Sequence, residues 1–377
     1  MTAGNALHWV FVRGSVALIL ASVSASGMAG AAQTPPIEPA PAALVEHGRI
    51  HTGFFAAPVR RVNLLEANNL GGESGRAMRH MRLKEWVGFT VNSPEIYGAM
   101  IIQDAKYASS GTLYLYDKVE KRFYEWLVVD WPWRVQLPET LWQGQSRARG
   151  RAGEMLFEHA LEAGYHRATL RLKAHGDTPQ AAVDVTFHED LRAVEPLVVS
   201  LPIGQEHHTY THKAPLRLAG QVRVGDRVYT FDPARDLGNL DEQKTFYPYR
   251  SAWMWGTFAA PSVEGREVMI NFVDQMTPED MAGEDALWVD GQLELITQPT
   301  IIAEPQPGHF RIESADGRVR LTFVPEGSKD ERRNYGLIAM DYQQFYGRYN
   351  GTIMDAAGTV HHFDAVFGVL ERMQARF

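Results

Sequence analysis

Short β-type runs recur along the chain from about residue 83, and they constrain the fold more than any other feature of the sequence. The runs are rich in Val, Ile, Thr and aromatic residues, many alternate polar with apolar positions, and most are bounded by Gly, Asp, Asn or Pro. They cover residues 85–91, 97–103, 112–118, 122–129, 166–174, 181–189, 218–224, 268–273, 309–314, 319–326 and 347–354. Hairpin signals stand at 224–227, 315–318 and 356–359.

So many strands with almost no helix predict an all-β fold of the sandwich or barrel kind. Residues 148–164 have some helical character, although Gly150 and Gly153 interrupt them. The strand count exceeds one small barrel, which favours two β units. We place the division in the Pro-containing segment 195–216, which gives an N-terminal unit of residues 45–205 and a C-terminal unit of residues 206–377.

The N-terminus has the pattern of a secretory signal peptide. Arg13 precedes an apolar run from Val16 to Val23, and small residues follow up to Ala31. The run is shorter than the roughly 20 residues that span a bilayer, so an anchor is disfavoured. We expect residues 1–32 to be cleaved, the Pro- and Ala-rich residues 33–44 to form a linker, and the mature protein to be periplasmic or secreted and not membrane-spanning.

Composition and missing motifs exclude several classes of function. The net charge of −8 argues against a nucleic-acid partner, because phosphate binding needs a basic face. The 377 residues include no Cys, which removes disulfides, thiolate nucleophiles and Cys-based metal sites. G-x-S-x-G, P-loop, G-x-G-x-x-G and H-E-x-x-H motifs are absent from the sequence, and we expect no cofactor.

The stretch 239–258 concentrates charges and aromatic rings. As a strand, residues 249–256 would direct Tyr249, Trp253 and Trp255 to one face and Arg250 to the other. The rings would then line either a packed core or a ligand cavity. Asp241, just before them, is either structural or a buried carboxyl poised as an acid.

Two further groups have a chemical and a structural interpretation. His208 and His212 would share one strand face and could begin a zinc site, or they are ordinary polar strand residues. The acidic segment 274–285 could supply the paired carboxylates of a glycosidase, but a loop cluster of acids is more often solvated turn chemistry.

Six blocks together resemble the domain-of-unknown-function 2804 family, over about residues 45–375. The blocks are residues 83–91, 101–107, 114–117, 246–256, 286–291 and 345–353. That family looks distantly similar to lipocalin-like, two-barrel proteins that include carotenoid hydratases and tocopherol cyclases. The resemblance implies two lipocalin-like barrels or half-barrels packed together.

By the same resemblance, Asp241 takes the position of an acid, and Trp253 and Trp255 take positions in a cavity wall. The sequence departs from the hydratase pattern at Glu242 and Gln243, where an Asp-His-Gln run would be expected. The missing His argues against proton transfer at this place.

Three functions remain open on the sequence alone. The first is an exported carrier that binds a hydrophobic small molecule, a lipid or terpenoid, in a barrel cavity. The second is a hydratase, isomerase or cyclase in which Asp241 protonates an alkene, and the third is zinc binding through His208 and His212. For the first, the expected cavity wall is Trp253, Trp255, Tyr249, Trp86 and Tyr107, with Arg250 or Lys84 meeting a polar end of the ligand.

Overall fold

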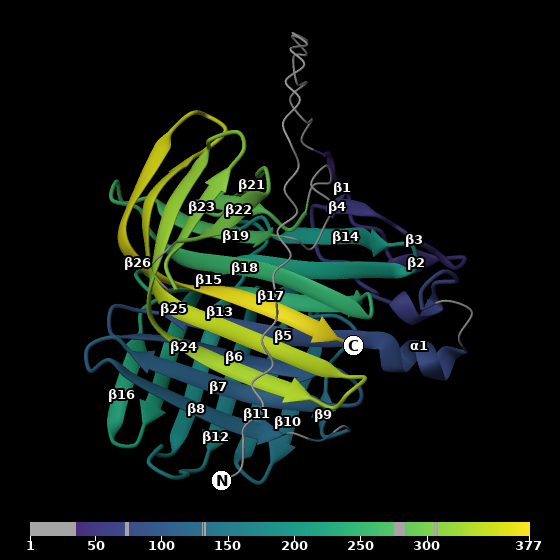
Figure 1. The fold of residues 1–377 in the computed structure, drawn as a ribbon, viewed down its shortest axis with the longest axis horizontal. Helices are drawn as coiled ribbons and strands as arrows, with labels where there is room; N and C mark the ends of the chain where they lie inside the picture. Colours follow the sequence, from purple (N-terminus) through teal and green to yellow (C-terminus); the bar gives the residue numbers. More distant parts are fainter. Residues whose placement is uncertain are drawn as a thin grey trace, which may run out of the picture. The chain divides into compact units, whose positions relative to one another are not determined.

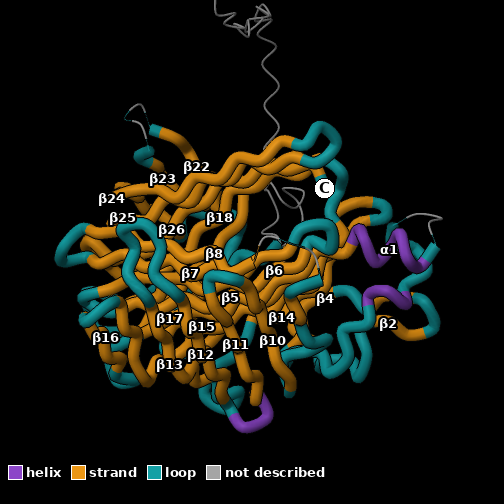
Figure 2. The backbone as a smooth tube through the Cα atoms, turned by 90° about the horizontal axis from the view of Figure 1, so that it is seen from below, coloured by secondary structure: helices purple, strands orange, loops and turns teal. Residues whose placement is uncertain are grey.

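A computed structural model describes residues 35–71, 75–129, 131, 133–274, 283–304, 306 and 308–377. The expected signal peptide, residues 1–32, lies outside the described residues. Strands make up most of the described chain, and the single α-helix α1 lies at one end of the molecule (Figure 2). Within the described ranges, no helix is long and apolar enough to cross a membrane.

The first sheet contains β1 and β4–β17, and its main path runs β8-β7-β6-β5-β17-β15-β13-β12-β11-β10-β9 (Figure 1). The path strands, in chain order, are β5 Leu83–Asn92, β6 Ile96–Asp104, β7 Ser109–Asp117, β8 Arg122–Val129, β9 Val135–Gln136, β10 Gly144–Gly150, β11 Gly153–Ala160, β12 Tyr165–Leu172, β13 Ala181–His188, β15 His207–Val224 and β17 Leu237–Phe246. The strands that pair off this path are β1 Ile37–Glu38, β4 Gly53–Phe55, β14 Leu197–Gly204 and β16 Arg227–Phe231. The sheet curls until β8 and β10 lie close together.

The second sheet contains β18–β26 in the order β21-β20-β19-β18-β26-β25-β24-β23-β22. Its strands are β18 Arg250–Pro261, β19 Glu267–Asp274, β20 Ala286–Val289, β21 Gln292–Leu295, β22 Pro299–Ala303, β23 Phe310–Ser314, β24 Val319–Asn334, β25 Ala339–Met354 and β26 Val360–Arg376. The remaining elements are the pair β2 Val45–Glu46 and β3 Arg49–Ile50, the helix α1 Arg76–Arg82, and the 3-10 turns η1 Leu64–Glu66 and η2 Leu161–Ala163.

Alternating side chains fill the inside of each curled sheet. On β11, Met155 and Phe157 are fully buried in the core of the first sheet, and the residue between them points outward. Phe258 and Phe272 are buried in the core of the second sheet. Each sheet therefore has its own apolar core, and the expected all-β architecture of two half-barrels is confirmed.

The two sheets meet along a third, mostly aromatic cluster that includes Tyr97, Tyr114, Tyr346 and Phe367. In Figure 1 the long strands β24–β26 lie in front of β5–β7, and both groups of strands contribute residues to this cluster. Within the described residues the chain passes from the first sheet to the second once, through residues 247–249 between β17 and β18.

Some local expectations differ from the structure. Residues 148–164 form the antiparallel β10–β11 hairpin and η2 instead of a helix. Gly153 has φ +143° there, and a Cβ at this position would lie 2.0 Å from the Arg171 carbonyl oxygen, so the glycine is needed for the strand path. Part of the expected linker also joins the fold, because β1 pairs with β4 and Leu44 is fully buried.

The sequence-based division at residues 205/206 falls between β14 and β15, which pair with each other in the first sheet. The change of sheet occurs later, between Phe246 and Arg250. The hairpin expected at 224–227 is confirmed, since Val224 pairs with Arg227.

Candidate functional site

A cavity of about 200 Å³ lies between the two sheets. The first sheet contributes side chains of β5, β6, β7, β15 and β17 to its wall, and the second contributes β18, β19 and β24–β26. This location differs from the expected one inside a barrel, because the inside of each curled sheet is filled by its own core. The cavity instead uses strand faces that point away from those cores.

Most of the predicted wall residues come together in this cavity. Lys84 and Trp86 of β5 line it, as do Trp253 and Trp255 of β18 and the predicted acid Asp241 of β17. They share it because alternate residues of a strand point to the same face. The first sheet thus presents an acid and a ring directly opposite the two tryptophans of the second sheet.

Three predicted ligand-binding residues lie outside the cavity wall. Tyr249 is 47% exposed, and its hydroxyl donates to the Leu337 carbonyl at 2.6 Å. Arg250 lines a separate, shallow hollow that also contains Arg332 and Arg376. Tyr107 is absent from the wall, although its ring centroid lies 4.6 Å from the Lys84 Nζ.

Stacked rings connect the two sheets at the cavity. The Tyr247 ring stacks on Trp86 of the first sheet, with centroids 6.2 Å apart, and on Trp253 of the second, at 5.2 Å. The Phe377 ring also stacks on Tyr247, with centroids 4.8 Å apart. The Gln243 amide donates to the Tyr247 hydroxyl at 3.0 Å, which fixes the central ring.

An ion pair lies in the same wall. The Lys213 Nζ donates to the Asp241 Oδ1 at 2.5 Å and lies 3.4 Å from the Glu284 Oε2. The Trp86 Nε1 donates to the second oxygen of Asp241 at 3.2 Å. Burial lowers the pKa of Lys213, but the two carboxylates outweigh it and raise that pKa above its ordinary value. Lys213 is therefore held as a cation.

Two further carboxyl groups in the wall, Glu371 and Glu284, lie close to this ion pair or to the tryptophans. Glu371 of β26 accepts hydrogen bonds from the Trp253 Nε1 at 3.0 Å and the Gln344 Nε2 at 3.2 Å. Burial raises its pKa, and the negative charge of Asp241 raises it further. Burial also raises the pKa of Glu284, against the opposing effect of Lys213.

The sequence carried a weak signal for these two residues. Glu284 belongs to the acidic segment that suggested a glycosidase, and it is the member of that segment found in the cavity wall. Glu371 shares one face of β26 with the apolar residues Val369 and Met373, but no motif marks it. Residues 275–282 lie outside the described residues.

The histidines considered for zinc already have protein partners. The His208 Nε2 lies 2.7 Å from the Ser200 Oγ, and the His212 Nε2 lies 2.7 Å from the Glu189 Oε1. In the part of the chain that the structure describes, no group of three or more His, Asp or Glu side chains is placed to hold a metal ion.

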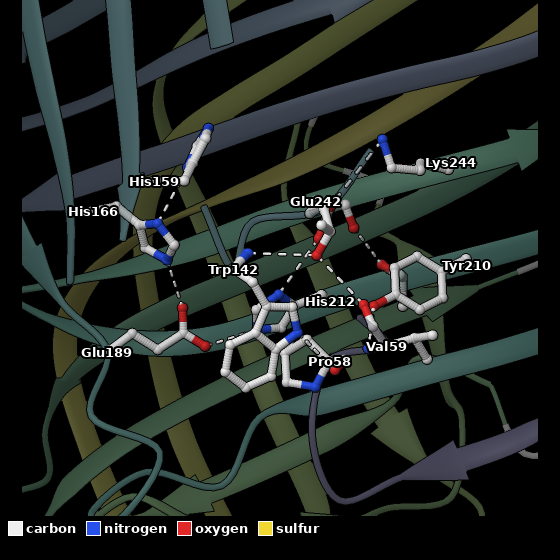
Figure 3. A network of polar contacts seen from close by, with 12 residues as sticks. Pro58, Val59, Trp142, His159, His166, Glu189, Tyr210, His212, Glu242 and Lys244 are labelled. Carbon is white, nitrogen blue, oxygen red and sulfur yellow. Dashed lines mark hydrogen bonds and ion pairs between the residues drawn. The ribbon is translucent and has the colours of Figure 1, made fainter. Parts of the chain in front are cut away.

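His212 belongs instead to a buried polar network inside the first sheet (Figure 3). Glu189, which is fully buried, contacts His212 through one oxygen and the His166 Nε2 through the other, at 2.9 Å. The network continues to Glu242 and Lys244, and Lys244 donates to the Glu85 Oε1 at 2.9 Å. Glu85 lines the cavity, so the network reaches the site at one end.

A model of the family described as domain of unknown function (DUF2804) matches residues 37–377. The chain belongs to this family. The DUF2804 assignment confirms the resemblance found in the sequence, and it covers both sheets.

No curated protein matches this DUF2804 chain. Among solved structures, the crystal structure of CghA with Sch210972 has a TM-score of 0.49 and 11% identity, over 77% of this chain and 87% of that one. The crystal structure of kievitone hydratase from Nectria haematococca has a TM-score of 0.44 and 10% identity, over 77% of this chain and 88% of that one. At these values neither similarity bears on chemistry.

Proposed function

We propose that this protein is an acid–base enzyme of the hydratase, isomerase or cyclase kind, acting on an apolar small molecule held between the sheets. The observation that carries the proposal is Glu371. It is a half-buried carboxyl with a raised pKa in the cavity wall, and no cation contacts it among the described residues. A carboxyl with a raised pKa in a ring-lined cavity is a typical general acid.

The neighbouring charges assign different roles to the carboxyl groups. Asp241 pairs with Lys213 and therefore serves as the fixed negative charge. That charge disfavours ionisation of Glu371, which keeps a proton on Glu371 at higher pH than an ordinary Glu. In the proposal Glu371 donates the proton, and Asp241, the acid expected from the sequence, positions Lys213 and tunes Glu371.

The rings suit the intermediate of such a reaction. When Glu371 protonates an alkene, the π bond is consumed, a C–H bond forms and the adjacent carbon becomes cationic. The Trp86 and Trp253 rings, which line the cavity, would stabilise that cation, and Tyr247 holds both rings in place by stacking on them. Addition of water and loss of one of its protons gives hydration, loss of a different proton from carbon gives isomerisation, and attack by a second alkene followed by loss of a proton gives cyclisation.

Solvent deuterium tests the proposal. Purified protein is incubated in D₂O with a panel of terpenoid alkenes and unsaturated fatty acids, and deuterium uptake into carbon is measured by mass spectrometry. We expect uptake with the unaltered protein and with Glu313→Gln, an exposed control on β23. Glu371→Gln should lose about 100-fold or more of the rate and retain binding, measured by quenching of tryptophan fluorescence.

The other outcomes are equally informative. Binding without deuterium uptake would replace the enzyme by a carrier for the same class of ligand. Equal rates in Glu371→Gln and Glu313→Gln would remove Glu371 from the role of acid.

Export is part of the proposal, because residues 1–32 have the pattern of a signal peptide. N-terminal sequencing of the protein made in a secreting host should find a start near residue 32 or 33, and an intact Met1 would refute export by cleavage.

A further inference from the structure

The cavity wall contains two lysines in opposite electrostatic environments. Lys213 of β15 is surrounded by the carboxylates of Asp241 and Glu284 and stays charged. Lys84 of β5 is equally buried, at 3% exposure, but no carboxylate pairs with it among the described residues. The same cavity thus contains one lysine paired with carboxylates and one lysine without a carboxylate partner among the described residues.

The contacts of Lys84 are few and specific. Its Nζ donates one hydrogen bond, to the Met81 carbonyl at 2.7 Å, and lies 4.6 Å from the centroid of the Tyr107 ring. The nearby carboxylates Glu85 and Asp104 are engaged by a different cation, Lys106. The surroundings of the Lys84 Nζ are therefore the Met81 carbonyl, the Tyr107 ring and the cavity.

This environment makes Lys84 a good nucleophile. Burial lowers the pKa of Lys84 to about 8, and the positive charge of Lys106 lowers it in the same direction. A lysine that is desolvated and close to another cation is the usual form of an amine that attacks carbonyl carbon. At pH 7 a pKa of about 8 leaves roughly 300 times more free amine than an ordinary lysine has.

We propose that Lys84 condenses reversibly with the carbonyl group of an aldehyde or ketone ligand bound in the cavity. The amine nitrogen forms a bond to the carbonyl carbon and gives a carbinolamine. The carbonyl oxygen then leaves as water with the two amine hydrogens, and a C=N bond replaces the C=O bond. No oxidant or reductant is needed.

The geometry supports a covalent anchor at this place. Lys84 lies on the same face of β5 as Trp86, so a ligand tethered at Lys84 would extend along the Trp86 and Tyr247 rings toward Asp241. This inference rests on the proposed function only in that a ligand occupies this cavity. The ligand class that follows from it is an apolar carbonyl compound. The inference does not depend on Glu371 as the acid.

Reductive trapping tests the proposal on the whole chain. The protein is incubated with trans-cinnamaldehyde and sodium cyanoborohydride, and the cinnamyl adducts are located by peptide mass spectrometry. We expect labelling of Lys84 at least about 10-fold faster than of the exposed Lys121. The rate at Lys84 should rise with pH with a midpoint near 8, and cinnamyl alcohol, which has no carbonyl group, should slow it by occupying the cavity.

Two variants sharpen the result. Lys84→Arg keeps a cation but cannot form the imine, so this adduct should vanish, while Lys121→Arg should leave it unchanged. The proposal is wrong if the adducts spread over exposed lysines without preference for Lys84, or if the labelling rate at Lys84 has its pH midpoint near 10.5. Both of these measurements use the unaltered protein. If no adduct forms at Lys84 while deuterium uptake through Glu371 persists, the proposed imine at Lys84 is wrong and the proposed acid–base function is unaffected.

Discussion

The buried Glu189 carboxylate offers the sharpest test of how the first sheet is held together. Glu189→Gln keeps the shape of the side chain but removes the charge that faces His166 and His212 at 2.9 and 2.7 Å. Charge-assisted hydrogen bonds contribute about 1.5–3 kcal/mol each, and breaking one side of a buried ion pair costs about 3–5 kcal/mol. Because the amide still offers one acceptor, we expect the free energy of unfolding to fall by about 3–4 kcal/mol.

Asp184→Asn provides the matched control. Asp184 lies on β13 close to Glu189 in sequence, and it accepts two hydrogen bonds from Arg167 at 2.9 and 3.0 Å. Its side chain is 41% exposed, so water screens the pair and we expect a loss below about 1 kcal/mol. The two variants remove the same kind of group and differ mainly in burial.

The assay is guanidinium unfolding at pH 6, followed by tryptophan fluorescence, with hydrogen–deuterium exchange of β13 and β15 as a local readout. The reasoning fails if the two variants lose stability equally, or if Glu189→Gln stays within 1 kcal/mol of the unaltered protein. Faster exchange confined to β13 and β15 would show that the loss is local to the network.

Three further outcomes are expected. Burial lowers the pKa of His212, but the charge of Glu189 has the larger effect and raises that pKa. The protonated His212 therefore contributes its full stability below about pH 6.5, and this stability is lost as the pH rises through the raised pKa. Thermal melts from pH 6 to 10 should show a steeper decline of the melting temperature in the unaltered protein than in Glu189→Gln. Gly256→Ala should cost about 1–3 kcal/mol in denaturant unfolding, because its Cβ would lie 2.3 Å from the Phe272 ring. Trp255→Phe should lower the melting temperature through loss of the 2.8 Å hydrogen bond to Asn271, whereas an unchanged value would show that water replaces the indole.

The fold was predictable because strand patterning is local. Runs such as 85–91 and 181–189 alternate and end at turn residues, and they became β5 and β13. Residues 153–160 were harder, since Met155, Leu156 and Phe157 in succession fit a helix as well as a strand. Residues 153–160 form a strand because they pair with β10 and β12. That pairing depends on the tertiary structure and not on the local sequence pattern.

The candidate site was only half predictable. Asp241, Trp253 and Trp255 lie within one short stretch, so the sequence indicates that they belong together. Glu371 joins them from β26, 130 positions further along, because β26 pairs with β18. Alternation shows which residues share a face of one strand, but it does not show which face of the other sheet they meet.

The single passage of the chain between the sheets limits how the cavity can open. Residues 247–249 are the whole covalent link between β17 and β18, and a fully extended backbone from Phe246 to Arg250 spans at most about 14 Å. Among the described residues the main chain joins the two walls at this one place, and the other connections between them are non-covalent contacts. The hydrogen bond from the Tyr116 hydroxyl to the Glu326 carboxylate, at 2.8 Å, is one such contact, and any separation of the walls there has to break it.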